Sequence, residues 1–140
     1  MEDKMAKRFD DTEKWDRPWF RKLKIEHKLL WKFILDKCDV AGIWYVDFDL
    51  ASFYIGVPLD REDAKIAFDK QIDVKGDRWL IRDFIFFQYG NLKPSNKIYP
   101  SVLKKLLDGG WDGGSILDAS PIDGAKDKDK DKDSSKTVSK

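Results

Sequence analysis

The sequence predicts one small α+β domain followed by a charged tail, on three observations. The chain has 140 residues, a length that suits a single domain. Apolar residues recur at helical spacing over residues 24–38 and give way to short β-branched and aromatic runs at 43–46 and 71–82. After the glycine-rich stretch at 109–114 no periodic apolar pattern returns. We therefore expect a folded domain over residues 1–112 and a disordered Lys/Asp-rich tail over 113–140, because strict Lys-Asp alternation cannot form a core.

The first predicted helix spans residues 24–38. Its apolar stripe is Ile25, Leu29, Leu30, Phe33 and Ile34, with charged residues on the opposite side. We expect Phe33 to fill the centre of this stripe in the core. Asp39-Val40-Ala41-Gly42 is a stop signal, and the β-branched, aromatic run 43–46 after it predicts a brief strand.

Two further helices are predicted from their caps. Asp47 can accept hydrogen bonds from the first turn of a helix over residues 48–55, which Gly56 and Pro58 end. Asp60 plays the same part for a third helix. Its apolar face is Ala64, Ala67 and Phe68.

A change of period then predicts a hairpin. Apolar and polar residues alternate over 71–75, a second run of extended type covers 78–82, and the turn Lys75-Gly76-Asp77-Arg78 joins the two runs. In this hairpin Ile72 and Val74 should face Trp79 and Ile81. The run Phe84–Phe87 is apolar on both faces and should be buried. A fourth helix follows Pro100 and closes at Gly109, with Val102, Leu103, Leu106 and Leu107 on its apolar side.

This order of elements predicts a winged helix-turn-helix with one additional C-terminal helix. The order is helix, short strand, helix, helix, hairpin and helix. Several segments also resemble the N-terminal domain of phage and prophage replication-initiation proteins, the replisome-organiser group. They are Lys7-Arg8-Phe9, Asp11-Thr12-Glu13-Lys14-Trp15, Pro18-Trp19-Phe20-Arg21-Lys22-Leu23, Lys28-Leu29-Leu30-Trp31, Cys38-Asp39, Ala41-Gly42-Ile43-Trp44, Leu50-Ala51-Ser52-Phe53 and Phe87-Gln88-Tyr89-Gly90. The resemblance spans about residues 7–108 and implies DNA binding in replication initiation. We expect no domain within these 140 residues that could recruit a helicase or its loader.

Charge is distributed unevenly along a chain whose net charge is only +1. Residues 14–37 carry eight basic and three acidic side chains. Residues 39–69 carry two basic and seven acidic side chains. Four lysines follow at positions 93, 97, 104 and 105. A predicted third helix that begins Asp60-Arg61-Glu62-Asp63 disfavours insertion into the major groove. The basic segments elsewhere are better placed to neutralise phosphates.

The candidate DNA-binding residues lie in the N-terminal arm, the wing and the last helix. They are Lys7, Arg8, Lys75, Arg78, Lys97, Lys104 and Lys105, with Arg61 and Lys65 as a secondary pair. Each could instead be an ordinary solvated cation. The acidic second and third helices leave open a protein-interaction module that binds a replication or other partner, or they could simply complement helix dipoles. A transcriptional regulator is a variant of the DNA-binding interpretation.

Seven aromatic residues are expected in the core, although they could instead stack on unpaired bases: Trp44, Tyr45, Trp79, Phe84, Phe86, Phe87 and Tyr89. Trp15 and Trp19 should pin the N-terminal segment to the domain. No enzyme, cofactor, small-molecule substrate or metal site is predicted, because His27 lacks a local catalytic partner and Cys38 resembles a buried apolar residue. The chain has no apolar run long enough to span a membrane. It has a single cysteine, which cannot form an internal disulfide, so we expect a location in the bacterial cytoplasm.

Overall fold

The computed structural model describes residues 6–118, which form two compact units divided between Arg82 and Asp83. The fold is α+β, with a three-stranded antiparallel sheet of order β1-β3-β2 that includes a hairpin following the helices. This arrangement agrees with the predicted class. The Lys-Asp alternation lies outside the described residues.

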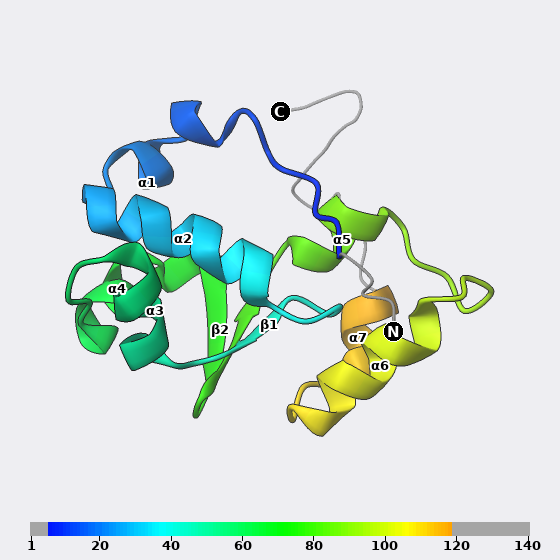
Figure 1. The fold of residues 1–140 in the computed structure, drawn as a ribbon. Coiled ribbons are helices and arrows are strands. Elements are labelled where there is room, and N and C mark those ends of the chain that lie inside the picture. The colour runs from blue at the N-terminus through cyan, green and yellow to red at the C-terminus, as the bar shows by residue number, and fades with distance from the viewer. Residues whose placement is uncertain (1–5, 119–140) are drawn as a thin grey trace, which may run out of the picture. The chain divides into compact units, whose positions relative to one another are not determined.

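The first unit holds the sheet and most of the predicted elements (Figure 1). In chain order these are η1 (Lys14–Asp16), α1 (Pro18–Arg21), α2 (Ile25–Lys37), β1 (Ile43–Tyr45), α3 (Phe48–Ile55), α4 (Arg61–Ala67), η2 (Asp69–Gln71), β2 (Ile72–Lys75) and β3 (Arg78–Ile81). The three helices, the short strand and the hairpin predicted here are confirmed. The single turns η1, α1 and η2 were not predicted, because they are too short to show an apolar period.

Both predicted helix caps are present. Asp47 Oδ1 accepts from the Leu50 amide at 3.0 Å, and Asp60 Oδ2 accepts from the Asp63 amide at 3.0 Å. Helix α3 ends at Gly56, whose φ of +96° favours glycine. Local chemistry therefore fixes the ends of the helix pair α3–α4.

The hairpin has the predicted register, with Ile72 opposite Ile81 and Val74 opposite Trp79. Strand β1 adds to the other edge of β3, where Trp44 lies opposite Trp79. The Trp79 ring is fully buried and lies 5.4 Å from Trp44, 5.6 Å from Phe48 and 6.4 Å from Phe68. The core of this unit is thus an aromatic cluster between the sheet and the helices.

The predicted register of α2 is wrong in part. Leu30 and Ile34 are fully buried as expected, but Ile25 is 74% and Leu29 47% exposed, and Phe33 is only half-buried. The core side of α2 contains His27 and Trp31 instead, which were not predicted to face inward. The reason is the aromatic cluster, since Trp31 packs 5.0 Å from Phe68 and thereby rotates the stripe away from Phe33.

The N-terminal segment is packed on α2 through its tryptophans, as predicted. The Trp19 ring lies 5.0 Å from Trp31, and Trp15 lies 5.0 Å from the buried Phe20. Lys14 is buried as well, and its ammonium group donates to Asp10 and to the Asp11 carbonyl. A paired lysine can be buried in this way because its charge keeps hydrogen-bond partners.

The second unit is helical in its described part and contains α5 (Phe84–Tyr89), α6 (Tyr99–Asp108) and α7 (Gly113–Asp118). Helix α6 matches the predicted fourth helix, with Val102 and Leu106 fully buried, but Leu107 was wrongly predicted on its apolar side and is 54% exposed. The expected full burial of Phe84–Phe87 is wrong, because this run forms a helix that exposes about half of Phe86 and Phe87. A helix presents successive residues to different sides, so a short apolar run cannot all face one core.

The boundary predicted at residue 112 also needs correction. Trp111 and Leu117 are buried, and α7 begins at Gly113, the first residue of the predicted tail. A Cβ atom at position 113 would lie 2.7 Å from Leu103 Cδ1, so the missing side chain lets α7 pack closely on α6. The described residues include no helix that is long and apolar enough to cross a membrane.

Candidate nucleic-acid interface

The turn end of the β2–β3 hairpin, which is the predicted wing, lies beside a row of three exposed side chains: a tyrosine, an arginine and a lysine. Tyr45 of β1 lies opposite Arg78 of β3, and Arg78 lies opposite Lys75 of β2. Residues directly opposite each other in neighbouring strands point to the same face. The Arg78 guanidinium lies 5.2 Å from the centroid of the Tyr45 ring, which is a cation–π contact. The row therefore combines an aromatic ring, a guanidinium and an ammonium group on one face.

Two acids of the hairpin have arginine partners, whereas a third acid near the row, Asp39, accepts a hydrogen bond from the Tyr45 hydroxyl at 3.3 Å. Asp77, in the turn between Lys75 and Arg78, accepts from Arg61 at 2.7 Å. Asp73, one step along the same face of β2, lies 3.8 Å from Arg82. These pairs offset the two acidic charges of the hairpin.

The secondary pair from the sequence, Arg61 and Lys65, lies on α4 beside acidic groups. Arg61 joins the first turn of α4 to the wing through Asp77 and the Gly76 carbonyl. Lys65 lies 3.6 Å from Glu62 one turn earlier on the helix. Arg61 thus acts first as a positioning residue that holds the wing turn against α4.

The two arm residues differ in their surroundings. Lys7 is exposed, whereas Arg8 is half-buried against the end of α2. The Arg8 guanidinium donates from Nε to the Leu35 carbonyl at 3.1 Å and from Nη2 to the Cys38 carbonyl at 2.7 Å. These carbonyls belong to the C-terminal end of α2, where a cation is favoured by the helix dipole. Arg8 therefore has a structural task.

Lys97, Lys104 and Lys105 belong to the second unit. Lys97 precedes α6 and Lys104 and Lys105 lie on it. Lys104 lies 3.0 Å from Asp108 in an exposed i,i+4 pair, which is worth a few tenths of a kcal/mol. Lys97 is exposed and Lys105 is half-buried.

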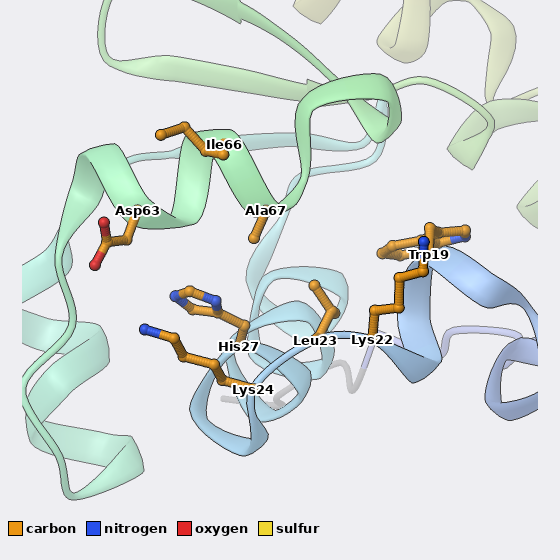
Figure 2. A pocket seen from close by; sticks show the side chains of 8 residues that line it. All are labelled: Trp19, Lys22, Leu23, Lys24, His27, Asp63, Ile66 and Ala67. Carbon is orange, nitrogen blue, oxygen red and sulfur yellow. The ribbon is translucent and has the colours of Figure 1, made fainter.

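A pocket in the first unit lies between the start of α2 and helix α4 (Figure 2). Its volume is about 490 Å³, and it is lined by Trp19, Lys22, Leu23, Lys24, His27, Asp63, Ile66 and Ala67. His27 is buried and its ring lies 6.0 Å from Phe68. The lining residues combine two ammonium groups, one imidazole and one carboxylate, and they include no hydroxyl or thiol nucleophile.

Comparisons of the chain with protein-family models, curated protein sequences and solved structures find no match. Any function proposed for the chain therefore depends on its own structure and on the resemblance of its sequence segments to replication-initiation proteins.

The remaining reactive groups are accounted for by packing. Cys38 is buried, and burial raises the pKa of its thiol to about 11, so the neutral form predominates near pH 7. Residues 6–118 contain no group of three or more His, Cys, Asp or Glu side chains that could hold a metal ion.

Sequence reasoning missed Tyr45 as a partner of the wing, because it grouped this residue with the core aromatics. The pairing of a short strand with the hairpin is a long-range contact that no local pattern reveals.

Proposed function

We propose that this chain is a DNA-binding winged-helix module whose wing contacts the phosphate backbone of duplex DNA. The observation that carries the proposal is the row Tyr45–Arg78–Lys75 on one face of the wing end. The order α2, β1, α3, α4 and hairpin supports assignment to the winged-helix class.

The chemistry of the row suits phosphate binding. A guanidinium can donate two parallel hydrogen bonds to a phosphate, and Tyr45 beneath it restricts its orientation. Lys75 adds a second cation on the same face. Each neutralised phosphate releases condensed counterions, so this contact mode predicts binding that weakens steeply with salt.

Helix α4 contributes less to DNA binding in this proposal. Its first turn contains Glu62 and Asp63 after the cap Asp60, which would meet phosphates with like charge. Lys7 and the lysines of the second unit are proposed as additional sequence-independent contacts. The resemblance to phage and prophage replication-initiation proteins supports a role in replication, and a transcriptional role would use the same surface.

The test measures anisotropy of labelled duplex and single-stranded DNA at several salt concentrations. Replacing both Lys75 and Arg78 by alanine should weaken duplex binding at least tenfold and lower the salt slope by about 2. The matched control is Lys65→Ala, whose charge is already offset by Glu62 and whose removal should change affinity less than threefold. An unchanged affinity in the wing double variant would reject the wing as the contact.

A second comparison separates direct contact from positioning. Arg61→Ala should weaken binding because it leaves Asp77 uncompensated between Lys75 and Arg78. Adding Asp77→Asn should restore most of the loss if Arg61 acts through Asp77. A loss that persists in the double variant would assign Arg61 to the DNA contact itself. Absence of binding to any DNA at low salt would instead favour the protein-interaction alternative, with the acidic α3–α4 side as its surface.

A further inference from the structure

An exposed apolar surface runs across α2 and α3 of the first unit. We call it the apolar ridge. It consists of Ile25, Leu29 and Phe33 on α2 and of Leu50, Phe53, Tyr54 and Val57 on and just after α3. All are exposed except Phe33, which is half-buried.

The members of the ridge are continuous. Ile25, Leu29 and Phe33 follow one another at four-residue spacing along one side of α2. The Phe33 ring lies 6.0 Å from Tyr54, and Tyr54 lies 5.5 Å from Phe53. Leu50 is four residues before Tyr54 on α3, and Val57 follows the helix cap Gly56.

The ridge is large for a surface without a partner. Phe53 is 77% exposed, and aromatic side chains carry about 150–250 Å² each. With the other members the exposed apolar area is on the order of 600 Å², at the upper end for a monomer surface and approaching the roughly 800 Å² per partner of a standard interface. The parts of the chain outside residues 6–118 contain few large apolar residues, so they are poor candidates to cover it.

The charges beside the ridge indicate what covers it. Residues 24–37 carry four lysines against Glu26 and Asp36, a net charge of +2, and residues 47–57 carry Asp47 and Asp49 alone, a net charge of −2. Lys28 lies one turn from Ile25 at one margin, and Asp49 lies one turn from Phe53 at the other. Lys37 lies within the ridge, 5.7 Å from the centroid of the Tyr54 ring, and Lys28 lies 5.9 Å from that of Trp15. The surface therefore has a mainly apolar centre, with Lys28 at its basic margin and Asp49 at its acidic margin.

We infer that the apolar ridge is the interface of a symmetric homodimer. A two-fold axis running along the helices, between α2 and α3, places the basic margin of one copy over the acidic margin of the other and joins the two apolar centres. An isologous interface requires such self-complementarity. A partner with one uniform sign of charge would match only one margin, so a second copy fits the pattern better.

Sedimentation equilibrium of the full chain from about 1 µM to about 300 µM tests this inference. The wild type should dimerise within this range, and Phe53→Glu should be monomeric throughout. The matched control is Ile66→Glu on α4, because Ile66 is equally exposed at 76% but lies outside the ridge. This variant should dimerise like the wild type, and circular dichroism should show that both variants fold.

Charge reversal tests the two-fold arrangement separately. Asp49→Lys and Lys28→Glu should each weaken dimerisation several-fold, and the double variant should recover most of the loss. A monomeric wild type over the whole range, a dimer insensitive to Phe53→Glu, or equal disruption by Ile66→Glu would each overturn the inference. Failure of the double variant to recover would overturn the proposed axis.

Discussion

Arg8 illustrates how a single contact changes the meaning of a residue. In the sequence it is one of two cations in a basic arm, whereas in the structure its guanidinium lies on the last carbonyls of α2. The last carbonyls of a helix lack an amide partner further along it, and the helix dipole makes them attractive to a cation. The Leu35 carbonyl also accepts from the Cys38 thiol at 3.4 Å. Arg8 should therefore contribute more to stability than to DNA affinity.

Arg8→Ala should lower the free energy of unfolding by about 1–2 kcal/mol, because it removes charge-assisted hydrogen bonds to half-buried carbonyls. Arg8→Lys should retain part of this contribution, since lysine keeps the charge but lacks the planar fork. Urea unfolding of the variants gives the values. Lys7→Ala removes the same charge at an exposed position and should cost less than about 0.5 kcal/mol. Equal effects of the two alanine variants would contradict the capping role.

At the scale of the element, α2 has two apolar sides with different tasks. One side packs Leu30, Trp31 and Ile34 into the aromatic core, and the other contributes Ile25 and Leu29 to the apolar ridge. The sequence alone combined residues from both sides into one stripe. Adjacent leucines at positions 29 and 30 provide a direct comparison of the two sides.

Leu30→Ala should destabilise the domain by about 2–5 kcal/mol, because Leu30 is fully buried and its truncation leaves a cavity. Leu29→Ala makes the same chemical change at a residue that is 47% exposed, and it should cost less than about 1 kcal/mol in the monomer. Denaturant unfolding at a protein concentration too low for dimerisation measures the free energy of unfolding of the monomer. A loss for Leu29→Ala as large as that for Leu30→Ala would restore the register predicted from the sequence, in which both leucines face the core.

At the scale of the whole molecule, the last buried residues along the chain define how much of the chain the fold needs. The last buried residues of the described part are Gly113 and Leu117, both in α7, which packs on α6. The predicted boundary at residue 112 would remove this helix.

A chain ending at Asp118 should melt like the full chain, because it keeps every described buried residue. A chain ending at Gly114 should melt at a lower temperature, since it lacks the buried Leu117 side chain. Thermal scans by circular dichroism measure both. Leu117→Ala in the full chain is the point-variant control and should reproduce much of the shift. Identical melting of the two truncated chains would show that α7 contributes nothing to stability.

The sequence by itself determined the features that depend on neighbouring residues. Asp47 and Asp60 are recognisable as caps because a carboxylate just before a helix meets unpaired amides wherever the helix lies. The hairpin register follows from alternation around Gly76, since strands have a period of two residues. These local rules were sufficient to predict three helices, a short strand and the hairpin of the first unit.

The tertiary structure alone decided which of several equivalent apolar or charged residues is used. Trp31 rather than Phe33 enters the core because Phe68, nearly forty residues later, packs against it. Arg78 gains Tyr45 as a partner through the pairing of β1 with β3, and Arg61 is occupied by Asp77 across sixteen residues of chain. Such contacts join segments far apart in sequence, and their energies depend on distance and burial in the folded chain, which no local pattern encodes.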